Sequence, residues 1–229
     1  LLYNTIGSSN SAFGFRSLQN NTTGTNNTAV GRSALQANTI ATDNSAFGYF
    51  SLGNNTTGIR NTAVGRSALV SNVVGSNNTA VGYQSLNSNT VSSLTAVGYR
   101  SLFSNTTGSN NSAFGIYSLR NNTTGTGTTA VGFCALRSNT TGSSNTAFGY
   151  QGLYANTIGT ANTAIGFEAL YNNTTNNNSA FGYKALNANT IGTNNTAIGS
   201  CALRVNTTGK DNIAIGYCAL STNTTANYN

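Results

Sequence analysis

The sequence has no histidine, proline, methionine or tryptophan, and only three of its 229 residues are acidic. Because Asp43, Glu168 and Asp211 are its only carboxylic side chains, it offers little material for acid–base catalysis or metal binding. Serine and threonine are abundant, but no histidine or lysine cluster is present to activate a hydroxyl. We therefore expect a protein that is not an enzyme and that binds neither a metal nor a cofactor.

Charge is also scarce. Charged residues make up 6% of the chain, and the net charge of +7 reflects missing acids more than an abundance of bases. The three carboxylates are too far apart in the repeat array to form a glycosidase pair. Nucleic-acid binding is not predicted, because the basic residues do not form a dense stripe. No apolar run reaches the roughly 20 residues of a membrane span.

What the sequence does contain is a repeat. It has 39 Asn, 36 Thr and 26 Gly, and the string T-A-V-G or a near variant recurs thirteen times. Its glycines are spaced by 17 residues, or by 16 in two places, both of which shorten the N-T-T-G-x-x stretch and mark it as a turn. These glycines are Gly14, Gly31, Gly48, Gly65, Gly82, Gly98, Gly115, Gly132, Gly149, Gly166, Gly182, Gly199 and Gly216.

Seventeen residues are too few for a helix–turn–helix repeat, and Thr, Val, Ile and aromatic residues favour strands. The sequence therefore predicts an all-β protein, a parallel β-solenoid of about thirteen 17-residue coils. No linker interrupts the array, so we expect residues 1–229 to form a single repeat domain. Neither end carries an atypical capping repeat, which predicts head-to-tail stacking or lateral association of copies.

Side-chain volumes suggest which strand positions face inward. Serine stands two residues before phenylalanine, whereas threonine stands two residues before valine or isoleucine; Thr146 with Phe148 is the exception. Positions i and i+2 share a face, and packed interiors reward such compensation. The predicted core is therefore this pair, the repeat leucine and the second turn threonine, which Ile40, Val74, Val91, Ile158 or Ile191 replaces. The larger members of the pair are Phe13, Val30, Phe47, Val64, Val81, Val97, Phe114, Val131, Phe148, Ile165, Phe181, Ile198 and Ile215.

An alanine occupies the middle of all thirteen strands, from Ala12 to Ala214. By alternation it should face away from that core. A solvated position would vary toward charged residues, so a constant alanine indicates that something approaches it closely. Two explanations stay open, a tight contact within the chain and a ladder at a subunit interface.

Two further columns are predicted to stack along the solenoid. An aromatic residue usually follows the repeat glycine, with gaps at Arg32, Arg66, Ile116 and Ser200. Such a column favours stabilising stacking, with a carbohydrate platform as the alternative. The Asn of each N-T-T-G turn should form an amide ladder, and its Gly should supply a positive φ. The dispersed arginines are expected on a solvated outer face, although neighbouring ones could contact a phosphate or an acidic sugar.

Cysteines and sequons give the remaining candidate sites. Cys201 and Cys218 lie one coil apart at a column expected to be exposed, so they could form a disulfide or remain free thiols; Cys134 shares the column. Several N-x-(S/T) sequons fall in the predicted exposed turn and are candidate N-glycosylation sites. They are Asn21, Asn55, Asn105, Asn122, Asn139, Asn173, Asn206 and Asn223.

The T-A-(V/I)-G core preceded by Asn, clearest at Asn27–Gly31, Asn61–Gly65, Asn162–Gly166 and Asn195–Gly199, resembles the head repeats of trimeric autotransporter adhesins. It is also similar to repeats of tail-fibre-like surface proteins. The resemblance implies a parallel β-roll in an extracellular fibre that serves adhesion or display. The coil is longer than the usual adhesin head unit, and residues 1–229 contain no segment that resembles the stalk or anchor of that family.

We therefore expect a non-enzymatic structural segment of an extracellular fibre or filament at a cell or virion surface, adhesive and glycosylated. Its expected partners are other copies of itself, as a trimer or another homo-oligomer, and surface glycans. The alternative is a binding module whose flat Asn/Thr face recognises ice or glycan.

Overall fold

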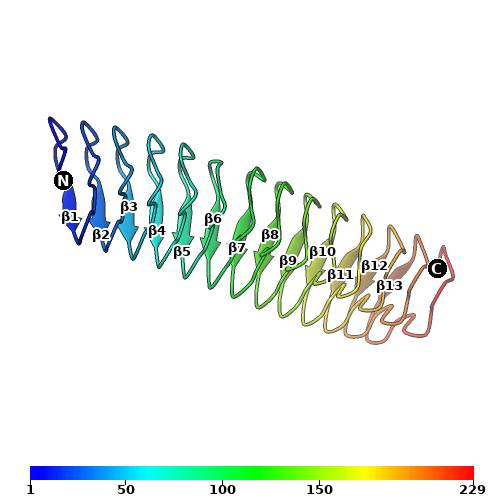
Figure 1. The fold of residues 1–229 in the computed structure, drawn as a ribbon. Helices are drawn as coiled ribbons and strands as arrows, with labels where there is room; N and C mark the ends of the chain where they lie inside the picture. The colour runs from blue at the N-terminus through cyan, green and yellow to red at the C-terminus, as the bar shows by residue number, and fades with distance from the viewer. The chain divides into compact units, whose positions relative to one another are not determined.

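The computed structural model describes residues 1–229, which fall into two compact units, Leu1–Ala113 and Phe114–Asn229. Both are all-β, and each is a parallel solenoid in which every coil contributes one three-residue strand (Figure 1). The fold class predicted from the repeat is therefore confirmed. The strands are Ser11–Phe13 (β1), Thr28–Val30 (β2), Ser45–Phe47 (β3), Thr62–Val64 (β4), Thr79–Val81 (β5), Thr95–Val97 (β6), Ser112–Phe114 (β7), Thr129–Val131 (β8), Thr146–Phe148 (β9), Thr163–Ile165 (β10), Ser179–Phe181 (β11), Thr196–Ile198 (β12) and Ile213–Ile215 (β13).

Strand pairing keeps the repeat in register. Within each unit, consecutive strands pair in parallel and strand order follows chain order. Alanine pairs with alanine at every step, as Ala29 with Ala46 and Ala147 with Ala164. Equivalent side chains of successive coils therefore form columns along each unit. The 16-residue coils preserve this register, because their missing residue lies in the turn and not in the strand.

Special backbone angles make the corners of each coil. The glycine after each strand has φ between 125° and 142°, a region open to glycine, and the repeat leucine four residues later has φ between 46° and 52°. The prediction of a positive φ for the N-T-T-G glycine is wrong, because none of these turn glycines has one. Close approach excludes a side chain there instead: a Cβ on Gly125 would lie 2.5 Å from Asn122 Oδ1.

The interior of each coil is small and partly polar. The strand alanine, the repeat leucine and two asparagines are fully buried in the inner coils, as at Ala147, Leu153, Asn139 and Asn145. The predicted inward direction of the leucine is confirmed. The alanine also faces inward, which decides in favour of a contact within the chain.

The predicted orientation of the larger strand residues is wrong. Phe47, Val64, Phe114, Phe148, Ile165, Phe181 and Ile198 are 38–41% exposed, and the end-strand residues Phe13 and Ile215 are 78% and 68% exposed. Val30, Val81, Val97 and Val131 are half-buried. The residue two positions earlier is also only partly buried in the inner strands. The volume compensation is thus between neighbours on one face, as inferred, but that face is the outer one.

The reason for the reversal is the thickness of the coil. A Cβ added to Gly152 would lie 3.5 Å from Ala147 Cβ and 3.8 Å from Ala164 Cβ, already in van der Waals contact. Gly152 precedes the buried Leu153, at a position that holds Ala or Ser in other coils. Only one small side chain from each wall therefore fits between the strand and the opposite segment. A phenyl ring has no room there and lies outside.

The second residue of the turn pair also faces outward. Ile40, Val74, Ile158 and Ile191 are 55–64% exposed, and Val91 is half-buried. Their predicted place in the core is wrong, because buried asparagines already fill the turn end of the thin coil.

These orientations predict unequal effects of two truncations in one coil. Leu153→Ala should destabilise the carboxy-terminal unit by about 2–5 kcal/mol, because a fully buried leucine leaves a cavity. Phe148→Ala should cost less, about 1 kcal/mol, because 41% of that side chain is already exposed. Urea denaturation followed by circular dichroism measures both. A larger loss for Phe148→Ala would contradict the orientation.

Candidate functional site

The sequon asparagines line the interior of the turn and not its surface. Seven of the eight are fully buried, and Asn223 is half-buried in the last coil. Asn38 Nδ2 donates to Asn21 Oδ1 at 2.8 Å and to the carbonyl of Ala41 at 3.1 Å. Asn156 repeats the pattern with Asn139 at 2.8 Å and Gly159 at 3.0 Å. The predicted amide ladder of the turn is confirmed.

N-glycosylation of these asparagines is therefore contradicted by the fold. A glycan would be attached at Nδ2, the atom that bridges each coil to its neighbour, and seven of these side chains have no solvent-exposed surface. Asn223 Nδ2 is engaged in the same way, with Asn206 Oδ1 at 3.2 Å and the carbonyl of Ala226 at 3.2 Å. The sequence prediction placed the turn at the surface correctly but assigned its asparagine to the wrong side.

A second asparagine ladder precedes the strands, and the sequence analysis did not predict it. Asn44 Oδ1 accepts from the backbone N–H of Asn61 at 2.9 Å, and Asn61 Nδ2 donates to the carbonyl of Gly75 at 2.9 Å. The Asn of the N-T-A string in nearly every repeat was its signal. Two columns of buried amides thus join the inner coils, and the second column is interrupted where Leu94 and Thr128 replace the asparagine.

The first turn threonine adds a hydroxyl ladder. Thr22 Oγ1 donates to the carbonyl of Thr39 at 3.1 Å, and Thr140 Oγ1 to that of Thr157 at 3.0 Å. Because the asparagines are buried and these hydroxyls donate along the stack, the flat Asn/Thr face expected for ice or glycan binding is not present in the predicted form.

All three cysteines are free thiols. Cys134 is 3% exposed, contrary to the exposed column that we expected, whereas Cys201 and Cys218 are half-buried. Burial raises the pKa of the Cys134 thiol, and the positive charges of Arg137 and Arg120 oppose that rise only in part. A raised pKa lowers the thiolate fraction near neutral pH.

We expect two fast thiols and one slow one. At about pH 8, a disulfide reagent such as DTNB should titrate Cys201 and Cys218 first and Cys134 last, because the thiolate is the reactive form and Cys134 is both buried and raised in pKa. Denaturant should make all three equivalent. Three equal rates in the folded protein, or a single titratable thiol under non-reducing conditions, would contradict this arrangement.

The aromatic residues after the repeat glycine stack on one another from coil to coil. In the carboxy-terminal unit the rings of Phe133, Tyr150, Phe167 and Tyr183 stack at centroid distances of 5.0–5.4 Å with interplanar angles of 6–17°. Because each inner ring covers the face of the next, stacking stabilises the ladder and the faces are not presented to a sugar. The geometry favours the ladder over the carbohydrate platform.

Arg32 and Arg66 are not gaps in that column. The Arg32 guanidinium lies 5.8 Å from the Phe15 centroid and 5.9 Å from that of Tyr49. Arg66 lies 5.5 Å from Tyr49 and 6.0 Å from Tyr83. Each arginine therefore takes the place of a ring in the stack, through cation–π contacts with the rings on both sides.

The three carboxylates are dispersed, as the sequence predicted. Asp43 accepts from Asn26 Nδ2 and Thr42 Oγ1, both at 3.1 Å, and Asp211 accepts from Asn194 Nδ2 at 2.9 Å. Glu168 pairs with Lys184 at 3.4 Å, and this contact raises the pKa of the lysine. No three His, Cys, Asp or Glu side chains gather at one place, and no helix has the length and hydropathy to cross a bilayer.

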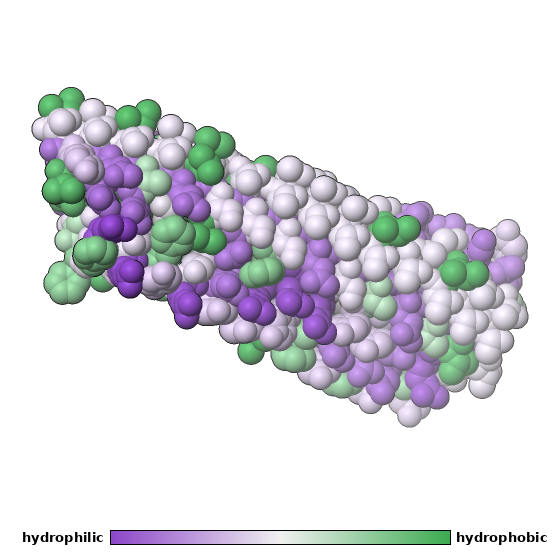
Figure 2. Space-filling model, viewed as in Figure 1, coloured by the Kyte–Doolittle hydropathy of each residue, from purple (hydrophilic) through white to green (hydrophobic).

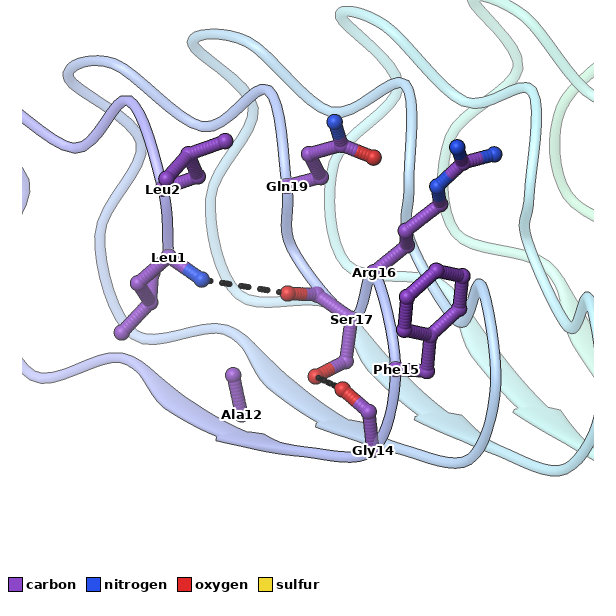
Figure 3. Close-up of a pocket in the computed structure, with 8 residues that line it drawn as sticks. All are labelled: Leu1, Leu2, Ala12, Gly14, Phe15, Arg16, Ser17 and Gln19. Atoms are coloured by element: carbon purple, nitrogen blue, oxygen red, sulfur yellow. Dashed lines mark hydrogen bonds between the residues drawn. The ribbon is translucent and has the colours of Figure 1, made fainter.

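A pocket of about 480 Å³ lies at the first coil (Figure 3). Its lining includes Leu1, Leu2, Ala12 and Ser17, and the N-terminal amine donates to the carbonyl of Ser17 at 3.2 Å. Ala12 is exposed, whereas its equivalents in the inner coils are fully buried. The pocket is thus the uncovered cross-section of the solenoid, with no convergent polar groups of a ligand site.

In this fold the buried asparagines hydrogen-bond adjacent coils to one another, and columns of rings and arginines lie on the outside. Comparison with protein-family models, curated proteins and solved structures finds no match for this chain.

Proposed function

We propose that this chain is a non-enzymatic structural segment of an extracellular fibre or filament, located at a cell or virion surface. Its partners in this proposal are further copies of the same repeat, stacked head to tail or side by side. Adhesion to surface glycans would use the outer columns, and N-glycosylation of the turn asparagines forms no part of the proposal.

The observation that carries the proposal is the use of the interior. The side-chain amides of Asn38, Asn61 and their equivalents form hydrogen bonds to the adjacent coils, and Leu35 and its equivalents in the inner coils are fully buried. Proteins of this kind gain stability from contacts between neighbouring repeats, so their length can vary without loss of the fold. That property suits a spacer or fibre segment.

Electron microscopy of the purified chain tests this function. We expect elongated particles that assemble into longer or thicker filaments on concentration. A variant with three added 17-residue repeats should be longer by about 5 Å per added coil, the spacing of hydrogen-bonded strands. Particles that remain monomeric at high concentration, or whose length does not follow repeat number, would contradict the proposal.

A second candidate function is the binding of ice, through the outer face of the strands instead of the Asn/Thr turn. The outer face of the strands carries a column of Ser or Thr, replaced by Ile213 in β13, beside a column of Val, Ile or Phe, in register and without a charged residue. Thermal hysteresis of the folded protein, abolished by Thr163→Lys on this face, would favour that candidate over a purely structural role. Absence of hysteresis would reject it.

A further inference from the structure

One outer edge of the amino-terminal unit concentrates positive charge. We define the arginine strip as Arg16, Arg32, Arg66 and Arg100 with the rings between them. Arg16 lies 5.1 Å from the Phe15 centroid, and Arg100 lies 5.8 Å from that of Tyr83. Together with the contacts of Arg32 and Arg66, rings and cations alternate from Phe15 to Tyr83. Tyr83 then stacks directly on Tyr99, with ring centroids 5.3 Å apart, and Arg100 lies over both rings. Figure 2 shows deep purple, strongly hydrophilic atoms gathered near this end of the molecule with green atoms among them.

Most guanidinium N–H donors of the arginine strip form no hydrogen bond within the chain. The side chains of Arg16, Arg32 and Arg66 make no hydrogen bond within the chain and are exposed, and Arg100 uses only Nε, which donates to Gln84 Oε1 at 2.8 Å. The rings flank the guanidinium groups and so restrict their motion. The in-plane N–H groups, which form the fork that binds carboxylates, therefore remain available to a ligand.

The charge of the strip is not balanced by the chain. The one carboxylate of this unit, Asp43, is bound by Asn26 and Thr42 in the loop before β3. No ion pair involves any of the four arginines, because the single salt bridge of the chain joins Lys184 and Glu168. An anion that reaches the strip would thus not have to displace a resident partner.

We propose that the arginine strip binds a linear acidic polysaccharide laid along the solenoid. Arg32 and Arg66 lie two coils apart in one column, about 10 Å, or twice the spacing of paired strands. This is the length of a disaccharide in an extended β-linked glycan, so every second uronic acid meets a guanidinium fork. The ring faces are covered by arginine or, between Tyr83 and Tyr99, by the neighbouring ring. They therefore do not offer the stacking surfaces that single-stranded nucleic acids use.

The carboxy-terminal unit provides an internal contrast. There the same column runs ring to ring from Phe133 to Tyr183, and its nearby cation, Lys184, is already paired with Glu168. Arg120 and Arg137 contact Tyr117 in a different column, and Arg137 also donates Nη1 to the Tyr154 hydroxyl at 2.7 Å. Along the column after the repeat glycine, the acidic glycan is therefore expected on the amino-terminal unit.

Calorimetric titration of the full chain with a β-1,4-linked mannuronate oligosaccharide tests the proposal, with the neutral β-1,4-mannan oligosaccharide as ligand control. We expect the acidic ligand to bind in roughly 0.15 M salt, where screening is strong, and the neutral one not to bind. Arg32→Gln with Arg66→Gln should weaken binding about tenfold or more, through loss of two bidentate contacts. The matched control, Arg60→Gln with Lys210→Gln, removes two charges outside the strip and should change affinity less than about twofold.

A second pair of substitutions separates recognition from charge and from folding. Arg32→Lys with Arg66→Lys keeps both charges and the cation–π contacts but removes the forks, so we expect a loss of affinity with unchanged circular dichroism. The proposal is overturned if the acidic oligosaccharide does not bind, or if both double Gln variants lose affinity equally. Equal binding of an oligothymidylate of the same charge would also overturn it in favour of unspecific polyanion attraction.

Discussion

Replacing Gly149 by alanine should unfold the carboxy-terminal unit or destabilise it by several kcal/mol. The glycine has φ of 131°, and a Cβ at this position would lie 2.5 Å from the carbonyl oxygen and 2.8 Å from the carbonyl carbon of Gly166. Both atoms belong to the backbone of the next coil, which cannot move without breaking the parallel pairing of β9 and β10. Backbone strain and overlap act together here. Thermal unfolding followed by circular dichroism measures the effect.

Gly127→Ala is the matched control for this prediction. Gly127 also has a positive φ, 62°, but no atom lies within 4 Å of the Cβ that alanine would add. Ala161 occupies the equivalent position in another coil with φ of 54°. We therefore expect a loss of only about 1–2 kcal/mol, the ordinary cost of a left-handed residue. Equal losses for the two variants would contradict the assigned close approach at Gly149.

Asn139→Leu should also destabilise the unit severely, by roughly 2–5 kcal/mol, because it removes three buried hydrogen bonds. Asn139 Nδ2 donates to Asn122 Oδ1 at 2.8 Å and to the carbonyl of Gly142 at 2.9 Å, and its Oδ1 accepts from Asn156 Nδ2 at 2.8 Å. Leucine has the same branched arrangement of four side-chain heavy atoms without the hydrogen-bonding groups, so the loss combines unpaired polar groups with the larger volume of its methyl groups. Urea denaturation of protein made in a host without N-glycosylation provides the measurement.

Asn172→Leu is the matched control, because it makes the same substitution at an asparagine whose side chain forms no hydrogen bond. Asn172 is half-buried, and only its backbone N–H takes part in a hydrogen bond, to the carbonyl of Asn187 at 3.1 Å. The equivalent position in another coil holds Val205, so an aliphatic residue fits there. We expect the midpoint of urea unfolding of this variant to lie near that of the wild type, and the midpoint of Asn139→Leu to lie well below it.

The period and the asparagine ladder of the turn could be predicted from the sequence because they depend on repetition alone. A constant spacing of the repeat glycine fixes one coil per repeat, and a constant Asn in the turn of a parallel stack must lie above another Asn. The two short coils also placed the turn correctly. None of these inferences needs the direction of any side chain.

The orientation of the strand was predicted wrongly because hydrophobicity was weighted above constancy of size. Phe148 and Val131 vary in volume from coil to coil, which a single-layer interior does not allow, whereas Ala147 and its equivalents never change. Between the strand and the opposite segment the interior admits little more than a methyl group, as the approach of Ala147 and Ala164 to Gly152 shows. An unvarying small residue was the better signal of the interior.

The arginines of the aromatic column were missed for a related reason. In sequence, Arg32 and Arg66 interrupt a row of rings, and a charged residue suggests a break in a stack. A guanidinium group is planar, however, and its faces pack on aromatic rings while its edge stays in water. Whether an arginine continues a column or leaves it depends on the distance to the rings on either side, which repetition alone does not give.

Cysteine labelling of three adjacent positions in β9 tests the central claim, that the strand alanine faces inward and its two neighbours outward. In a background with the native cysteines replaced by serine, Thr146→Cys, Ala147→Cys and Phe148→Cys are treated with a maleimide after circular dichroism has shown that each is folded. Ala147 is fully buried and Phe148 is 41% exposed, so positions 146 and 148 should label rapidly and position 147 slowly. Rapid labelling at 147 with protection at 146 and 148 would contradict the account and reverse the faces of the sheet.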